Sequence, residues 1–327
     1  MPKMHMSKKT LNQTNLETLG VEQLAALLME VSAGSADIKR RLRLELSHNL
    51  GASELAHDVR KRLVSLRKSI SYVSWRKRKA LIKDLDTQVT MIAMKIAPDD
   101  PTTAFDLLWQ FIEIAPSIYE RVDDSRGEVG DVFRAAIDHF DEIAPRATLD
   151  PAGLADRVWV AIQDNGYGEW DGIIPLLAPT LGASGLARLT QNVERYAEAS
   201  LAPEADAHEA IQFLRELRGT DNHAAQSKAR YVKWCLQEIA QASGDAVAYF
   251  AQYSEEDLRR KDVSAEVATL LLADGKNQDA LDLLLNAEQD GGDFGHEVWD
   301  IAYIACLTAM GRIHNAQAYR WDRFPRL

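Results

Sequence analysis

DGKNQDA at residues 274–280 returns 36 positions later as MGRIHNA at residues 310–316, within the stretch from Val263 to Phe324. Each copy places a Gly and an Ala five positions apart, between two helical patterns of apolar residues. Gly ends the first helix because it enters the left-handed backbone conformation at little cost. The small Ala lets the second helix cross close to the first. The period and the turn together predict stacked pairs of antiparallel helices.

The spacing in this stretch resembles the tetratricopeptide repeat, a helix-turn-helix unit with a Gly at its turn and an Ala five positions later. The second copy keeps Gly311 and Ala316, whereas Ile304 and Arg323 stand where small residues are expected. The resemblance covers roughly the last 65 residues and implies tetratricopeptide-like hairpins at the C-terminal end. The first copy fits at four positions, Ala268, Gly275, Ala280 and Ala287.

A second repeated pattern has a spacing of 50 residues. Asp100-Pro101 and Trp109 return as Asp150-Pro151 and Trp159. Asp at the N-cap followed by Pro at the first helical position is a strong helix start, because that position has no partner for a backbone N–H.

No segment has the pattern of a strand, so we expect an all-α protein of about a dozen or more helices, arranged as a solenoid of αα-hairpins. Further apolar helical patterns are found at residues 16–28, 37–49, 132–143, 173–181, 186–199, 208–217 and 224–240.

Composition excludes several classes of protein. Apolar residues make up 46% and charged residues 27% of the 327 residues, which is typical of a folded globular chain. Cys235 and Cys306 both lie in apolar helical patterns and are expected to be buried thiols in a reducing compartment. The first 17 residues lack the apolar core of a signal peptide, and no run approaches the ~20 apolar residues of a membrane span. We therefore expect a cytoplasmic protein without membrane contact.

Charge is distributed unevenly along the chain. Residues 1–100 carry 18 Lys and Arg against 11 Asp and Glu, whereas the other 227 residues carry 20 against 38. The expected organisation is a flexible leader over residues 1–15, N-terminal helices with a basic hairpin over 16–98, and a helical-repeat body over 99–327.

The basic hairpin contains ten Lys and Arg and no acid in the 24 residues from Arg60 to Lys83. We expect two antiparallel helices with a turn near residues 69–74, the second ending near Ile96. The apolar seam of the first helix runs over Leu55, Val59, Leu63, Leu66, Ile70 and Val73, and that of the second over Trp75, Ile82, Leu85, Val89, Ile92 and Ile96.

If Ser74 caps the second helix, four cations lie on its first turns, where the helix dipole is already positive. That placement is unfavourable unless an anion binds there. Nucleic acid and another anionic partner are two candidates, and Tyr72 and Trp75 at the tip favour unpaired bases. The third interpretation is that the acidic part of the same molecule or of a partner covers this face. The candidate anion-binding residues are Arg76, Lys77, Arg78 and Lys79.

The segment from Asp164 to Gly172 combines three glycines with two aromatic residues and several carboxylates. It lacks the spacing and the preceding strand of a dinucleotide-binding loop. It either holds a peptide or a small polar ligand, or it stops a helix while its aromatic side chains cover neighbouring helix ends. The candidate ligand residues are Tyr167, Glu169, Trp170 and Asp171.

Other motifs point away from catalysis and metals. The acidic cluster of Asp123, Asp124, Glu128 and Asp131 fails as a calcium loop, and we expect it to cap a helix near Asp131. His208-Glu209 and His296-Glu297 lack the second His of a zinc-protease motif. Nothing indicates a serine nucleophile, a phosphate-binding glycine loop or an activated cysteine. We therefore expect no catalytic residues, no cofactor and no metal.

The chain also resembles a bacterial family that is catalogued only as a domain of unknown function. This resemblance covers nearly the whole chain from Met6 and supports an all-α fold without implying an activity. It is carried by residues 7–12, 75–81, 123–125, 130–133 and 164–168.

The leading functional hypothesis is a non-enzymatic helical-repeat scaffold that binds a protein or peptide, because stacked helix pairs present extended concave surfaces. The alternative is binding of nucleic acid or another polyanion through the basic hairpin from Arg60 to Lys83.

Overall fold

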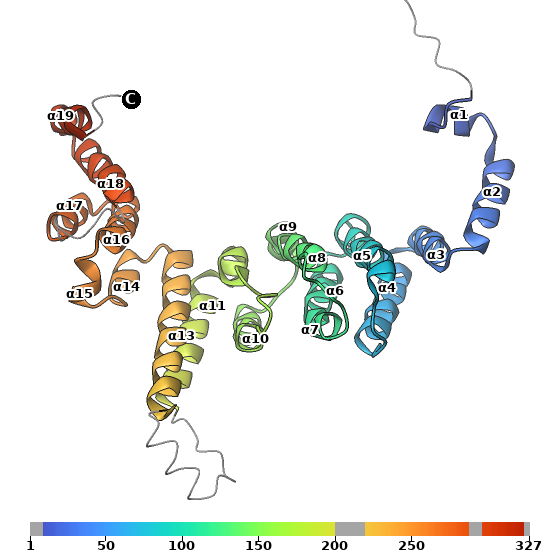
Figure 1. The fold of residues 1–327 in the computed structure, drawn as a ribbon, viewed down its shortest axis with the longest axis horizontal. Helices are drawn as coiled ribbons and strands as arrows, with labels where there is room; N and C mark the ends of the chain where they lie inside the picture. The colour runs from blue at the N-terminus through green and yellow to red at the C-terminus, as the bar shows by residue number, and fades with distance from the viewer. Residues whose placement is uncertain (1–8, 200–219, 288–295, 324–327) are drawn as a thin grey trace, which may run out of the picture. The chain divides into compact units, whose positions relative to one another are not determined.

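A computed structural model describes residues 9–199, 220–287 and 296–323. The chain divides into two compact units. Unit 1 comprises residues 1–148 and 166–170, and unit 2 comprises residues 149–165 and 171–327. The described residues form helices in both units, and their one β-bridge joins Val73 to Val122 (Figure 1). The all-α prediction is confirmed, whereas the helix predicted at 208–217 lies outside the described residues.

Unit 1 holds nine α-helices among the described residues, together with two short helices of other types. The π-helix η1 (Met91–Ile96) continues directly from α5. The 3-10 helix η2 (Ala144–Arg146) follows directly from α9. The α-helices are α1 (Gln13–Glu17), α2 (Val21–Ala33), α3 (Ala36–Leu50), α4 (Ala52–Arg67), α5 (Trp75–Thr90), α6 (Pro101–Glu113), α7 (Ala115–Tyr119), α8 (Glu128–Ile137) and α9 (Phe140–Ile143).

In the part of unit 2 that the structure describes, α11 and α13 run side by side, and α16 packs against α17 and α18 (Figure 1). The helices are α10 (Pro151–Gln163), α11 (Ile173–Glu198), α13 (Thr220–Ser243), α14 (Ala246–Phe250), α15 (Glu255–Leu258), α16 (Lys261–Ala273), α17 (Asn277–Leu285), α18 (His296–Ala309) and α19 (Ile313–Arg323).

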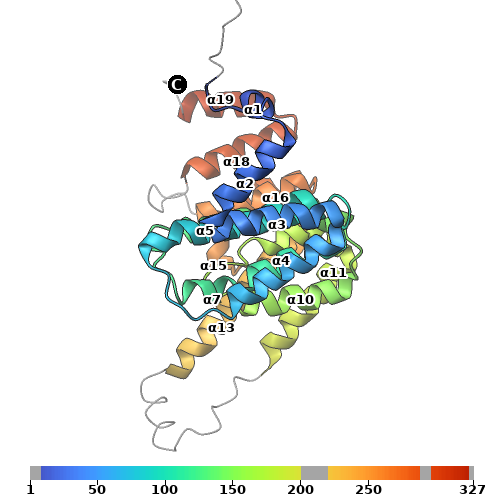
Figure 2. The ribbon, with the colours of Figure 1, turned by 90° about the vertical axis from the view of Figure 1, so that its right-hand side faces the viewer.

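The basic hairpin differs from the expected one in its outer half. Helix α4 ends at Arg67, so Ile70 and Val73 lie in the connection rather than on the helix, and Ile70 is 95% exposed. Trp75, expected in the apolar seam, is 71% exposed. Helix α4 packs mainly on α3 and also on η1 and α6, whereas α5 packs on η1 and α8. The end of α4 and the start of α5 lie apart (Figure 2). The apolar pattern of the sequence continues past Arg67, because such a pattern does not show where the backbone hydrogen bonding of a helix ends.

The two Asp-Pro helix starts are confirmed. The Asp100 carboxylate accepts a hydrogen bond of 2.9 Å from the backbone N–H of Thr103, and Asp150 accepts one of 2.7 Å from that of Gly153. Trp109 is 1% exposed and packs at 5.7 Å from Phe140, whereas Trp159 is half-buried in unit 2. Each cap therefore starts a helix that places a Trp nine residues later, although the two Trp side chains differ in burial.

Helix α11 is the one described helix long and apolar enough to cross a membrane, by length and composition alone. Its backbone leaves the helical conformation at Gly182, with φ 56° and ψ −173°. It therefore consists of two segments, as the separate patterns at 173–181 and 186–199 predict. Ten of its residues, most of them apolar, are buried inside the fold.

The C-terminal repeat forms the predicted turns. Gly275 and Gly311 have φ angles of 75° and 73°, in the left-handed region. After each Gly, the next backbone N–H donates a 2.8 Å hydrogen bond to a carbonyl five residues earlier, Leu271 or Leu307. This arrangement is the Schellman motif, which satisfies the last carbonyls of a helix. The Ala residues five positions after the glycines, Ala280 and Ala316, are fully buried. The tetratricopeptide-like assignment and the solenoid form are not confirmed by these contacts and stay predictions.

Replacing Gly275 by Ala should lower the free energy of unfolding of unit 2 by roughly 1–2 kcal/mol, because an L-residue is strained in the left-handed region. No atom lies within 4 Å of the added Cβ, so the effect is one of conformation alone. The control is Gly34→Ala, where φ is −89° and the space is also open. Urea unfolding followed by circular dichroism measures the stability of both variants. Equal losses of stability would contradict the left-handed conformation of Gly275 as the cause.

Replacing Asp100 by Ala should lower the stability of unit 1 by about 1 kcal/mol at neutral pH, because the N-cap hydrogen bond is lost. The Thr103 N–H holds the pKa of the Asp100 carboxyl below its ordinary value. The contribution is therefore present above the unfolded-state pKa and is lost as the pH falls through the lower folded-state pKa. Urea unfolding midpoints at neutral and strongly acidic pH measure the contribution of the Asp100 carboxylate to stability. The control is Asp99→Ala, a change at an exposed neighbouring position.

Candidate anion-binding hairpin

Eight of the ten cations between Arg60 and Lys83 are exposed, and none of the eight forms an ion pair with the described residues of unit 1. The other two, Arg62 and Arg78, are paired. The hairpin therefore presents a strongly positive surface that its own unit does not neutralise. We call these eight residues the basic face: Arg60, Lys61, Arg67, Lys68, Arg76, Lys77, Lys79 and Lys83.

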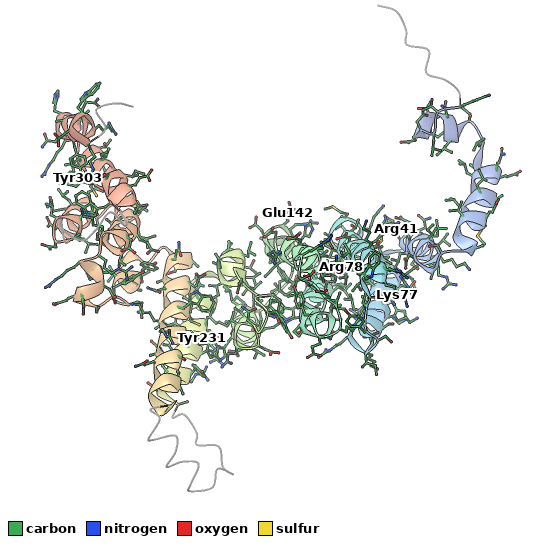
Figure 3. The ribbon with its side chains drawn as sticks, viewed as in Figure 1. Arg41, Lys77, Arg78, Glu142, Tyr231 and Tyr303 are labelled. Carbon is green, nitrogen blue, oxygen red and sulfur yellow. The ribbon has the colours of Figure 1, made fainter. Side chains whose placement is uncertain are left out.

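The four candidate anion-binding residues do not share one environment. Ser74 is the N-cap of α5 as expected, but its side chain makes no capping hydrogen bond. Arg78 lies 2.8 Å from Glu128 and donates a 2.9 Å hydrogen bond to the carbonyl of Asp123. Lys77 and Arg78 project from α5 (Figure 3), and Arg78 ties that helix to the acidic segment before α8. The interpretation that the protein's own acids occupy this face therefore applies to Arg78, while the other three cations stay exposed.

The tip of the hairpin exposes apolar and aromatic side chains among these charges. Tyr72 is 68% and Trp75 71% exposed, and the Arg76 guanidinium lies over the Trp75 ring at 5.2 Å. The tip backbone is anchored because the Val73 N–H donates a 2.8 Å hydrogen bond to the carbonyl of Arg121. Exposed rings on an anchored turn are available for stacking.

A buried carboxylate joins the three helices beneath the basic face. The Asp84 side chain on α5 is 4% exposed and lies 3.1 Å from the Arg40 guanidinium of α3. It also accepts a 2.8 Å hydrogen bond from Nε of Arg62 on α4 and one of 3.2 Å from Gln88. We call Asp84 with Arg40 and Arg62 the ionic node. Two guanidinium groups and an amide satisfy this carboxylate, as a buried charge requires.

Arg121 was missed by sequence reasoning, and it is the most unusual cation in this region. Its residue is 8% exposed, it forms no ion pair with the described residues, and its Nε is buried without a hydrogen-bond partner. Its two terminal nitrogens donate to the carbonyls of Leu66 and Ser71, both at 3.4 Å. Burial, with the nearby Arg62 charge, lowers the pKa of Arg121. No sequence signal marks it, because it lies outside the basic run.

The glycine-rich loop does not gather its four candidate residues into one place. Trp170 is 3% exposed and packs 4.5 Å from Trp109, and Glu169 is buried. Tyr167 is exposed and stacks on Tyr119 at 4.9 Å, while Asp171 belongs to unit 2 and accepts a 2.7 Å hydrogen bond from Asn165. The helix-stop interpretation accounts for the Trp and Tyr contacts, and a ligand role stays a prediction.

The acidic cluster before α8 caps that helix. The Asp124 carboxylate accepts hydrogen bonds from the backbone N–H groups of Val129 at 2.9 Å and Gly130 at 2.8 Å. Asp131, expected near the cap, lies inside the helix and pairs with Arg134. Backbone N–H groups therefore satisfy Asp124, and Arg134 pairs with Asp131.

The structure gathers no metal-binding group of three or more His, Cys, Asp or Glu among residues 9–199, 220–287 and 296–323. His208-Glu209 lies outside these ranges, so that motif is not described. Burial raises the pKa of Cys235 to about 12 and that of Cys306 to about 11. Both thiols therefore stay protonated near neutral pH, which opposes a nucleophilic role.

Comparison with known proteins gives one match. A family model described as "Family of unknown function (DUF6880)" matches residues 6–327. No curated protein and no solved structure matches the chain. The expected resemblance to an uncharacterised family is confirmed, and the comparison brings no activity with it.

Replacing Asp84 by Asn should lower the stability of unit 1 by about 1–3 kcal/mol, because two guanidinium groups lose their shared counter-charge. The loss is smaller than for a fully buried pair, since Arg40 and Arg62 are about a quarter exposed and can turn towards water. The control is Asp86→Asn on the same helix, where burial raises the carboxyl pKa and the charge is not stabilising. Chemical unfolding measures the stability of both variants. An unchanged midpoint for Asp84→Asn would contradict the structural role of the ionic node.

Proposed function

We propose, for a chain that belongs to the family of unknown function DUF6880, that the basic hairpin binds single-stranded nucleic acid. The observation that carries this proposal is the basic face itself, eight exposed cations without ion pairs in the described part of unit 1. Such a concentration of like charge destabilises a folded unit unless an anion neutralises it. A phosphate backbone supplies that neutralisation and releases condensed counterions.

The aromatic side chains at the tip favour a single strand over a duplex. Tyr72 and Trp75 are exposed, and Arg76 lies over the Trp75 ring, which combines ring faces with positive charge. Unpaired bases stack on such rings at about 1–3 kcal/mol per base, and a duplex has no free base faces to offer. The net charge of −11 works against a long duplex, because its phosphates would meet acids outside the hairpin.

Neutralising four cations of the basic face should remove most binding to a fluorescent single-stranded oligonucleotide at low salt. The variant combines Lys68→Ala, Arg76→Ala, Lys77→Ala and Lys79→Ala, and it leaves Arg62 and Arg78 in their structural ion pairs. Each lost phosphate contact also reduces the slope of log affinity against log salt by about 0.7. Fluorescence anisotropy of the full chain over a salt series measures both quantities.

A matched control removes four exposed cations from unit 2, namely Arg230, Arg259, Arg312 and Arg320. It changes the net charge equally and should leave affinity and salt slope nearly unchanged. Tyr72→Ala with Trp75→Ala should weaken binding without altering the salt slope, because stacking releases no counterions. If the wild-type chain binds no nucleic acid at low salt, acids of the protein or of a partner cover the basic face instead, and the proposal is wrong.

A second candidate is the helical scaffold for a protein partner, and helix α2 favours it. Only Ser32 of this helix is buried, although the helix is rich in apolar residues. Its exposed apolar side chains are Val21, Leu27, Leu28, Met29 and Val31. A patch of this kind on a folded chain is typical of protein interaction sites. Under this second proposal the chain is a cytoplasmic interaction protein. Its free, buried cysteines are typical of a protein in a reducing compartment.

The scaffold candidate is tested by affinity purification from the native cell with a Leu28→Asp, Met29→Asp variant. A partner that the wild-type chain retains and this variant loses supports the scaffold. The control is Gln23→Asp on the same helix, an exposed polar position that should keep the partner. Equal recovery with all three chains would contradict a role for α2.

A further inference from the structure

A cavity of about 230 Å³ lies where the end of α4 and the start of α5 diverge. Arg62, Ser65 and Ser69 line it from the α4 side, and Lys77 and Asp84 line it from α5. Arg121 closes it from the segment after α7. Few contacts join α4 to α5 directly, and all of the lining residues belong to unit 1.

Arg121 is the group in this cavity whose hydrogen bonding is incomplete. Its contacts with the carbonyls of Leu66 and Ser71 place a cation at the C-terminal end of α4, which the helix dipole favours. That structural role accounts for the two terminal nitrogens and leaves Nε, which is buried, without a partner. A buried guanidinium without a carboxylate is costly, and an anion in the cavity would satisfy it.

The charges around the cavity leave a positive excess. Asp37 and Asp84 line it, and the Arg40 and Arg62 guanidiniums lie against these carboxylates. These four charges balance. Arg121 and Lys77 then add two positive charges, and neither forms an ion pair with the described residues of unit 1. An excess of two matches a doubly charged anion better than a single carboxylate.

The hydrogen-bond donors approach the cavity from several sides. Lys77 is an ammonium donor on α5, and the hydroxyls of Ser65 and Ser69 come from the end of α4 and from the connection that follows it. The Arg62 terminal nitrogen lies 3.4 Å from the Ser65 hydroxyl, so the fork of this side chain also borders the space. Donors on opposite walls suit a tetrahedral anion such as phosphate, which has more acceptor oxygens than a carboxylate.

We propose that this cavity is a binding site for one phosphate group, held by Arg121 and Lys77 with the serine hydroxyls, either as free phosphate or as a small phosphate monoester. The volume exceeds that of one phosphate, which leaves room for a short ester substituent. The site shares Lys77 with the basic face, but its other residues, Arg121, Ser65 and Ser69, do not belong to that face, so one phosphate can occupy it whether or not a strand is bound.

The test is isothermal titration of the full chain with inorganic phosphate and, in a second arm, with glycerol 3-phosphate, both at constant ionic strength. Saturable binding of one equivalent in either arm is expected, and the tighter arm identifies the source of the phosphate group. Lys77→Met should weaken binding about ten-fold, because one charge-assisted contact is lost. Arg121→Gln should abolish binding, with folding checked by circular dichroism.

The matched control is Lys79→Met, which removes the same charge from the same helix outside the cavity and should change affinity less than two-fold. Ser69→Ala is a second variant, expected to weaken binding about three-fold, and it keeps the test decisive if Arg121→Gln fails to fold. The proposal is overturned if neither probe binds saturably to the wild-type chain. It is also overturned if Lys77→Met and Lys79→Met weaken binding equally, because that result indicates diffuse attraction to the basic face.

Discussion

The buried carboxylate of Asp84 is the constraint on which the arrangement of unit 1 depends. This carboxylate on α5 pairs with a guanidinium from α3 and another from α4. The carboxylate is too deeply buried for water to replace either partner. A buried charge of this kind contributes specificity of arrangement more than net stability, because desolvation offsets most of the attraction. The node fixes where α5 stands relative to α4, although the two helices pack mainly on other elements.

This arrangement has a consequence for the surface. Because α4 and α5 diverge beyond the node, their connection at residues 68–74 cannot be stabilised by a seam between them. The connection is held by the Val73 bridge to Val122 and by the Arg121 guanidinium at the end of α4 instead. Cationic and aromatic side chains are thus displayed on an anchored turn, which reduces the entropy lost when a ligand binds.

At the C-terminal end of unit 2, the described helices pack through glycine turns and small apolar residues rather than through a buried charge. There, neighbouring helices are joined by Schellman turns at Gly275 and Gly311 and pack through small buried residues such as Ala268, Ala280 and Ala316. The features on which the binding proposals rest, the basic face and the cavity at Arg121, both lie in unit 1.

The sequence by itself determined the all-α class and several helix starts and turns, because these depend on local chemistry. Asp100 and Asp150 hold their helix starts, and Gly275 and Gly311 adopt the left-handed turns that their positions required. The basic run was also visible, since charge is a property of composition. Only the tertiary structure decided that α4 stops at Arg67, that Arg78 is paired with Glu128, and that Arg121 closes a cavity with Lys77. These contacts join residues more than forty positions apart, and no local pattern encodes a distance in space between such residues.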